Sequence, residues 1–259
     1  MEFSVLDVPV RSVDMSELLR SFDRGLLVFH NLDTINKTRS NPEFRQVCQE
    51  AELGVIDGQV LRMVITLFFA RRAEKVSGSD FLPAFCVHHA SDPDVSVFLL
   101  GAAPGVAEEA RASLNLRAGR QIVVTAHSPS FSLLDDEVET ARVVEMVNSS
   151  GADTLFVGLG APKQELWMQR NRHRMPGVRR LVAVGATLDF EAGRVKRAPA
   201  WVSRIGLEWA FRLAVEPRRL WRRYLVEGPA VLWALASSRL VAAGPQVRDP
   251  AADEEKEAA

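Results

Sequence analysis

The sequence is poor in cysteine: its two cysteines, Cys48 and Cys86, are far apart and in no metal-binding or redox spacing. A disulfide framework is therefore not expected, and a reducing cytosol is the compartment that fits better. No uncharged apolar run approaches the ~18 residues that a membrane-spanning helix needs. The first seven residues are acidic and lack the basic stretch and apolar core of a signal peptide, so no secretion signal is expected.

The chain also has almost no net charge, since 32 Lys and Arg against 33 Asp and Glu leave −1 over 259 residues. The charge is unevenly distributed, however. Between Arg194 and Tyr224 nine basic residues accompany only two acidic ones, Glu208 and Glu216. A basic segment beside a balanced domain suggests an anionic partner. The last residues, 249–259, are acidic and rich in alanine and are expected to form a disordered tail.

Recognisable metal ligands are lacking as well. None of the five histidines is spaced with cysteines or carboxylates as a metal site requires. Asp92-Pro93-Asp94 matches the D-x-D pattern by which many nucleotide-sugar enzymes hold a divalent metal. It comes just before an expected strand, at the wrong edge of a sheet for a ligand, and we interpret it as a turn. We expect no metal and no cofactor.

Short apolar runs alternate with helical patterns along most of the chain, which predicts an α/β fold with a mostly parallel sheet covered on both faces. The expected strands are residues 25–29, 53–56, 95–100, 121–125, 154–157 and 180–184. The expected helices are residues 42–51, 59–72, 106–114 and 135–149, and residues 188–193 are expected to form a loop. Three parts are predicted: an α/β core over 1–197, a helical appendage rich in arginine and tryptophan over 198–244, and the tail over 245–259.

The stretch from Gly158 to Trp167 has the order of strand, glycine turn and helix start. Gly158 and Gly160 permit a tight turn or a close approach to a ligand, and Pro162 suits the first helical turn. In α/β proteins phosphates and nucleotides bind at such a place. An ordinary strand-to-helix turn fits the spacing equally well. Three adjacent polar residues of the first turn favour a site: Lys163, Gln164 and Glu165.

Other polar residues follow expected strands, at the edge where open α/β sheets place ligands. After the first strand come His30, Asn31 and Thr34, in an expected polar turn, although a lone histidine is more often structural. After the second strand comes Asp57, which could be a general base or the N-cap of the next helix. Spacing alone favours the cap. Three further residues belong to glycine turns, where Asp80 has the same ambiguity as Asp57: Gly78, Asp80 and Gly101.

Four arginines lie close together in the basic segment, at positions 218, 219, 222 and 223. On a helix Arg219, Arg222 and Arg223 would share one face. They could form a solvated or membrane-surface patch, or a clamp for a diphosphate, because guanidinium groups match phosphate oxygens in pairs. A departing diphosphate needs its charge neutralised, so a cationic clamp would be useful in a chain without a metal site.

Together these motifs resemble the WecG/TagA/CpsF glycosyltransferases, glycosyltransferase family twenty-six. The resemblance covers about residues 25–224. The motifs that carry it are residues 57–58 (DG), 76–80 (VSGSD), 158–167 (GLGAPKQELW), 188–193 (LDFEAG), 197–201 (RAPAW), 206–209 (GLEW) and 216–224 (EPRRLWRRY). The combination is specific, although any single motif is weak.

The resemblance implies a Rossmann-like core, often called the GT-E fold, in a metal-independent inverting enzyme. Such an enzyme moves a sugar from a UDP-sugar to a polyprenyl-diphosphate-linked acceptor in surface polysaccharide synthesis, as for exopolysaccharide or teichoic acid. It would lie peripherally on the inner face of the bacterial cytoplasmic membrane, with the arginine-bearing appendage against that surface. No nucleic-acid partner is implied, and an oligomer is possible. The alternative is a catalytically silent relative that binds a nucleotide-sugar or lipid carrier in an assembly complex.

Matched motif by motif, Asp57 corresponds to the family's proposed catalytic aspartate, which reverses the preference for a cap. Gln164 and Glu165 match a substrate-site pair. The appendage arginines that reach the diphosphate would be Arg212, Arg219 and Arg222. The family usually has Thr-x-Asn after the first strand, whereas this chain has Phe29 at the threonine position if Asn31 is the matching asparagine. We expect His30 to lie at the active-site edge and to take over part of the missing threonine's role.

Overall fold

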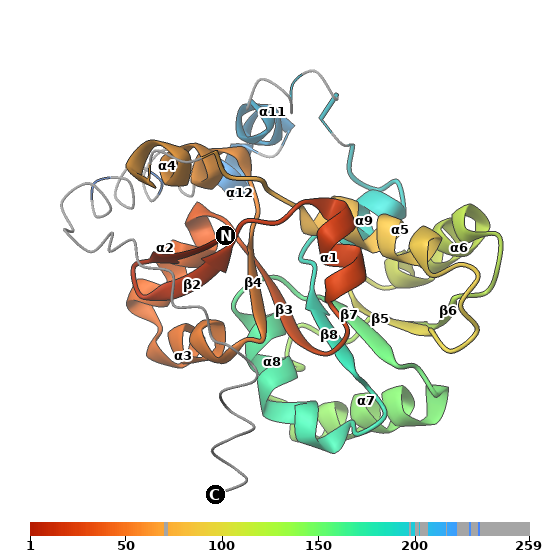
Figure 1. Cartoon of the computed structure of the whole chain (residues 1–259). Helices are drawn as coiled ribbons and strands as arrows, with labels where there is room; N and C mark the ends of the chain where they lie inside the picture. The colour runs from red at the N-terminus through yellow and green to blue at the C-terminus, as the bar shows by residue number, and fades with distance from the viewer. Residues whose placement is uncertain are drawn as a thin grey trace, which may run out of the picture.

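The computed structural model describes residues 1–69, 72–196, 198–199, 202, 207–215, 217–221, 228 and 233. It has the expected α/β fold, with an eight-stranded sheet in the order β1-β2-β4-β3-β8-β7-β5-β6 (Figure 1). The first two strands form an antiparallel hairpin, and the other neighbouring strands are parallel. The strands are β1 (Glu2–Val5), β2 (Val8–Arg11), β3 (Gly25–His30), β4 (Leu53–Ile56), β5 (Val97–Gly101), β6 (Val123–His127), β7 (Thr154–Gly158) and β8 (Arg180–Ala183).

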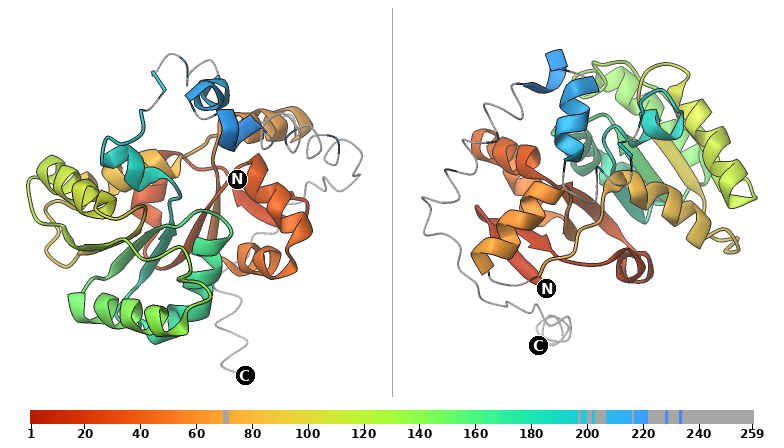
Figure 2. Two further views of the ribbon diagram at one scale, coloured as in Figure 1. Left: turned by 180° about the vertical axis from the view of Figure 1, so that it is seen from behind. Right: turned by 90° about the horizontal axis from the view of Figure 1, so that it is seen from above.

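Helices cover both faces of this sheet (Figure 2). In the described part they are α1 (Met15–Ser21), α2 (Leu32–Ser40), α3 (Pro42–Glu50), α4 (Gln59–Phe69), α5 (Gly78–His88), α6 (Val106–Ala118), α7 (Glu137–Ser150), α8 (Lys163–Asn171), α9 (Thr187–Glu191), α11 (Glu208–Val215) and α12 (Pro217–Trp221), with the 3₁₀ turn η1 (Arg172–Arg174). Along β3, Leu26 and Val28 face a core shared with α2, α3, α4, α7 and α8, whereas Leu27 and Phe29 face a core shared with α1, α5 and α6. The alternation follows from the two-residue period of a strand.

The six expected strands and four expected helices are all present, with ends that differ by a few residues. Helix α3 begins as predicted, with Pro42 at its first position and the Asn41 side chain accepting from the Phe44 backbone N–H at 2.9 Å. Three segments differ from the predictions. The first 23 residues, which gave no clear pattern, contain β1, β2 and α1. The expected polar turn after β3 is the start of α2, and the expected loop at 188–193 is mostly α9.

Helix α2 was not predicted because it is mostly polar and its start is defined by hydrogen bonds of its N-cap. The Asn31 side chain accepts hydrogen bonds from the N–H groups of Asp33 and Thr34, at 3.0 and 3.1 Å. The Thr34 hydroxyl in turn accepts from the Asn31 N–H at 2.8 Å, which completes a capping box. Only three residues of α2 are buried, so the apolar periodicity that indicates a helix is weak.

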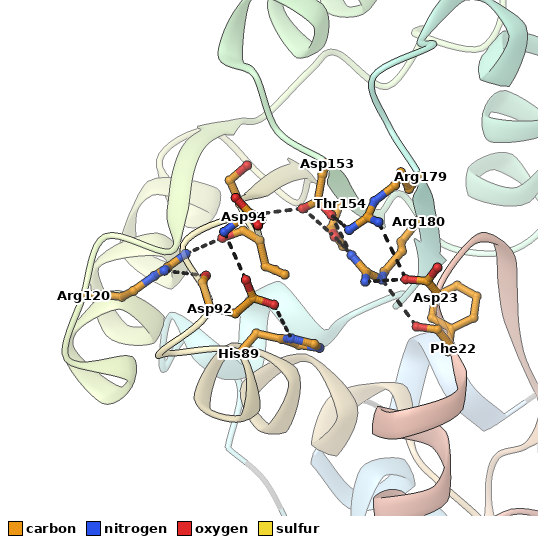
Figure 3. A network of polar contacts seen from close by, with 12 residues as sticks. Phe22, Asp23, His89, Asp92, Asp94, Arg120, Asp153, Thr154, Arg179 and Arg180 are labelled. Carbon is orange, nitrogen blue, oxygen red and sulfur yellow. Dashed lines mark hydrogen bonds and ion pairs between the residues drawn. The ribbon is translucent and has the colours of Figure 1, made fainter.

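The amino edge of the sheet is held by a network of charges around the buried Arg180, which Figure 3 shows from close by. Arg180, at the start of β8, donates to the Asp153 carboxylate at 2.6 Å and to the Asp23 carboxylate at 2.9 Å. Asp153 directly precedes β7, and Asp23 lies just before β3, so one guanidinium joins the starts of three strands. The carbonyl of Asp92 accepts from Arg120 at 2.6 Å in the same region. The D-x-D sequence thus lies in a turn at this edge, as predicted.

Helices α11 and α12 lie within the predicted appendage of residues 198–244. Most other residues of that range, and the whole predicted tail of residues 245–259, lie outside the described part. The proposed boundaries therefore remain predictions.

Candidate active site

A pocket of about 350 Å³ opens at the carboxyl ends of β3, β4 and β8. This is the edge where parallel sheets place ligands, because the following loops and helix starts surround it. Five segments of the core and two residues beyond it contribute to the walls. The lining residues are Phe29, Asn31, Leu32, Asp33, Thr34, Asn36, Lys37, Asp57, Gly58, Gln59, Val60, Ser77, Gly78, Ser79, Gly160, Ala161, Gln164, Ala183, Val184, Gly185, Ala186, Thr187, Phe190, Trp209 and Gly228.

Asp57 lines this pocket and is half-buried. It follows β4 directly, and its backbone N–H donates to the His30 carbonyl at 2.7 Å, which joins the ends of β4 and β3. The next residue, Gly58, has φ +84° and its carbonyl accepts the first helical bond of α4, from the Arg62 N–H at 3.3 Å. Gly58 therefore occupies the N-cap position, and Asp57 precedes it. The role of Asp57 as a general base stays a prediction.

Helix α2 brings a charged pair to the pocket that the sequence patterns did not single out. The Lys37 Nζ lies 2.8 Å from an Asp33 carboxylate oxygen and donates to the Ala161 carbonyl at 3.0 Å. Among the described lining residues Lys37 is the only one with a cationic side chain. The signal that could have revealed the pair is the four-residue spacing of Asp33 and Lys37 on a helix that starts at the ligand edge.

Gln164 lies in the first turn of α8 and lines the pocket, but its side-chain amide forms hydrogen bonds with other groups of the protein. Its side-chain oxygen accepts from the N–H groups of Gly160 and Gly185, at 3.1 and 3.0 Å. Its nitrogen donates to Glu165 at 2.8 Å. Gln164 thereby fixes the turns that follow β7 and β8 against each other. Glu165, its predicted partner in substrate binding, is 1% exposed and is not among the lining residues.

The position expected for His30 is wrong. We expected it at the active-site edge, but it is 0% exposed and absent from the pocket lining. The reason is that β3 runs one residue further than predicted, so the His30 side chain points to the same face as Val28. There its ring lies over β4, so close that a Cβ on Gly54 would be 2.7 Å from Nε2. Neither ring nitrogen has a hydrogen-bond partner among the described residues.

Phe29, one residue earlier, faces the opposite way and lines the pocket. Its ring packs on Phe81, with 5.7 Å between ring centroids. Gly78 lies against the same ring, since a Cβ there would be 3.2 Å from a ring carbon. Phe29 thus gives the wall near Asn31 and Asp57 an apolar surface.

The remaining predicted substrate residues divide into two groups. Asn31, Thr34, Gly78 and Gly160 line the pocket. Four others do not: Gly101, Gly158, Asp80 and Lys163. The two glycines allow the ends of neighbouring strands to lie close together. A Cβ on Gly101 would lie 2.5 Å from the Gly158 carbonyl oxygen, and a Cβ on Gly158 would lie 2.7 Å from the Gly185 carbonyl oxygen.

Asp80 is exposed on α5, and the N-cap of this helix is Ser77 rather than Asp80. Lys163 is also exposed, and its Nζ donates to the Phe131 carbonyl at 3.0 Å. The arginines of the predicted clamp cannot be placed in the same way. The whole of Arg222 and the side chains of Arg212 and Arg219 lie outside the described part.

Two buried groups next to the pocket should change the free energy of unfolding with pH in opposite directions. Burial raises the pKa of Glu165 from 4.5 to about 7, and burial lowers the pKa of His30 from 6.5 to about 4. The stabilisation from Glu165 is complete below pH 4.5 and is lost as the pH rises towards 7. That from His30 is complete above pH 6.5 and is lost as the pH falls towards 4. Each change amounts to roughly 3 kcal/mol, at about 1.4 kcal/mol per pKa unit.

Single substitutions should therefore reveal opposite slopes between pH 4.5 and 6.5. In Glu165→Gln the free energy of unfolding should decrease as the pH falls, because only the His30 effect remains. In His30→Leu it should decrease as the pH rises. Urea denaturation at several pH values measures both slopes, and identical slopes in the two variants and the wild type would contradict this assignment.

The family of the chain follows from a comparison with known protein families. A model of the glycosyl transferase WecG/TagA/CpsF family matches residues 3–244, nearly the whole chain. The chain belongs to this family. It is accordingly a glycosyltransferase of polysaccharide biosynthesis, and the family implies in general terms a nucleotide-sugar donor and a lipid-linked acceptor.

No described helix is long and apolar enough to cross a membrane. Likewise, the described part contains no group of three or more His, Cys, Asp or Glu side chains arranged to hold a metal ion. Among the described residues that line the pocket, the charged ones are Asp57, Asp33 and Lys37.

Proposed function

We propose that the chain is an inverting, metal-independent transferase that moves a sugar from a UDP-sugar to a polyprenyl-diphosphate-linked acceptor. The observation that carries this proposal is the position of Asp57, a residue that lines the pocket directly after β4. The pocket of about 350 Å³ is of a size used for small ligands. A GT-E type core and a place on the inner face of the cytoplasmic membrane are part of the same proposal.

In this mechanism one displacement makes the new bond. The acceptor hydroxyl oxygen attacks the anomeric carbon, and Asp57 takes the hydroxyl proton as general base. The bond between the anomeric carbon and the diphosphate oxygen breaks, and UDP leaves with that electron pair. Attack from the side opposite the diphosphate inverts the anomeric configuration. The apolar surface of Phe29 lies in the same wall as Asp57, so it belongs to the part of the pocket that selects the sugar.

Cationic side chains would neutralise the charge that develops on the diphosphate. Lys37 is the described candidate, because its ammonium group lies at the pocket between Asp33 and Ala161. We propose that Arg219 and Arg222, with Arg212, complete the set. This assignment rests on their match to family motifs, since their side chains lie outside the described part.

Release of UDP from a panel of UDP-sugars, with a polyprenyl-diphosphate-linked sugar as acceptor, tests this proposal. We expect acceptor-dependent release with one donor class, unchanged by EDTA. Loss of activity in EDTA would contradict the cationic clamp. Absence of transfer with every donor, together with retained UDP binding, would favour a second candidate function.

That second function is a catalytically silent partner that binds a nucleotide-sugar or lipid carrier in an assembly complex. The observation in its favour is Phe29, which lines the pocket at the position where family members usually have threonine. Asp57 favours an active enzyme, so we place transfer first.

A further inference from the structure

Helix α4 has the composition of a buried helix but one face lies in solvent. Leu61 and Ile65 point into the core, yet Met63 and Leu67 are 58% and 79% exposed. Arg62 is the only charged residue among the eleven of this helix. An ordinary surface helix carries charged and polar residues on its outer face. Exposed apolar side chains that are neighbours on one face mark a surface that meets another apolar body.

This apolar face lies beside the mouth of the pocket. Gln59 and Val60, the first two residues of α4, line the pocket, and so does Trp209 of α11. Met63 is one helical turn beyond Gln59, a distance of about 6 Å along the axis. In Figure 1 and in the left view of Figure 2, α4, α11 and α12 lie at the same end of the molecule. Val215 of α11 and Trp221 of α12 are exposed there as well.

The chemistry around this face fits an anionic lipid surface. Arg72, just beyond α4, has an 85% exposed side chain, and Arg218 on α12 is exposed too. The acceptor of this family is lipid-linked in general terms, and its lipid stays in the bilayer. The end of the molecule that carries the pocket must therefore come close to the bilayer. Helix α4, about 16 Å long, is too short to cross a membrane but long enough to rest in the headgroup zone.

We propose that the outer face of α4 docks on the anionic surface of the bilayer and brings the pocket mouth to the lipid-linked acceptor. This inference rests on the proposed function, because the acceptor supplies the reason for contact. It adds an element of the catalytic core to the membrane contact that the sequence assigns to the appendage alone. Met63 and Leu67 enter the headgroup zone, and nearby arginines contact lipid phosphates.

The test is sedimentation of the full chain with vesicles of phosphatidylcholine and phosphatidylglycerol. Met63→Gln combined with Leu67→Gln should weaken binding by roughly tenfold or more, as expected when two apolar side chains no longer leave water. The matched control is Leu116→Gln combined with Val138→Gln, which changes two exposed apolar residues on α6 and α7, 85% and 65% exposed. The control should bind like the wild type, and thermal unfolding should be unchanged in both double variants. Equal vesicle binding by the α4 variant and the wild type would overturn the proposal.

A fluorescent label distinguishes the bilayer from other occupants of this face. Cys48 and Cys86 are buried, so a cysteine introduced as Leu67→Cys can be labelled selectively with an environment-sensitive dye. Its emission should shift to the blue only when anionic vesicles are added. A blue-shifted emission without vesicles would mean that a second copy or another segment of this chain covers α4, and would overturn the proposal.

The outcome can be separated from that of the proposed function. Loss of vesicle binding in the α4 variant supports the docking face even if no donor sugar is transferred in the release assay. If sugar is transferred to the acceptor but the α4 variant binds vesicles as the wild type does, the transferase proposal is supported and the docking proposal is contradicted.

Discussion

Asp57→Asn should lower turnover by about 10²–10⁴-fold, the usual contribution of a positioned general base. Asparagine keeps the shape of the side chain but cannot take the proton of the attacking hydroxyl. Folding should be unaffected, because the backbone N–H of residue 57 still donates to the His30 carbonyl and Gly58 still occupies the N-cap position. UDP binding should remain close to that of the wild type. Steady-state transfer rates and calorimetric titration with UDP measure the two quantities.

Asp80→Asn is the matched control for this experiment. Asp80 is also an aspartate after a glycine turn, and the sequence left it with the same two interpretations as Asp57. It is exposed and does not line the pocket, so its substitution should leave turnover unchanged. Near-normal turnover of Asp57→Asn would remove Asp57 as the base, whereas an equal loss in both variants would indicate a general effect of charge.

The second large effect is expected at the opposite edge of the sheet. Arg180→Met should lower the free energy of unfolding by about 3 kcal/mol, because the largely buried Asp153 carboxylate loses its nearer cation and keeps only the more exposed Arg179, 3.2 Å away. The Arg180 and Asp153 side chains are both largely buried, and the bond between them measures 2.6 Å. Since the network joins the starts of β3, β7 and β8, the loss should affect the whole sheet. Urea denaturation at neutral pH measures the change.

An exposed ion pair provides the comparison. Arg174 lies 2.8 Å from Glu137, whose side chain is largely exposed. Arg174→Met should cost less than about 1 kcal/mol, as for most surface pairs. A similarly small cost for Arg180→Met would show that the network at the amino edge is not a main contributor to stability. The folded fraction of Arg180→Met should keep its turnover, because the network lies at the edge away from the pocket.

The sheet could be predicted because its strands are short apolar runs whose order along the chain alternates with helices. The strand around Val28 and the helix opened by Asn41 and Pro42 are clear from local chemistry alone. Helix α2 was missed, since a capping box rather than apolar periodicity fixes it. The hairpin of β1 and β2 was missed as well. It forms by pairing with the edge of the sheet, and the first 23 residues alone give no pattern that predicts this pairing.

The site was partly predictable for a similar reason. A residue that follows a strand is at the ligand edge, and this placed Asn31 and Asp57 at the pocket. It did not determine which way a side chain points when the strand continues for one more residue. Because β3 includes His30, the His30 side chain lies on the same face as Val28, in the core, whereas Phe29 points to the opposite face and lines the pocket. The role of Gln164 also required the structure, because its two backbone partners, Gly160 and Gly185, are brought together only by the pairing of β7 with β8.

The most direct test of the central claim is hydrogen exchange of the full chain with and without UDP, because it shows where the nucleotide binds. We expect slower exchange in the turns around the pocket, at residues 31–37, 57–60, 160–164 and 184–187, in the wild type and in Asp57→Asn alike. The amino edge around Asp153 and Arg180 should not change. Protection at that edge, or no protection at any of the pocket turns, would contradict the assignment of this pocket as the site of a glycosyltransferase.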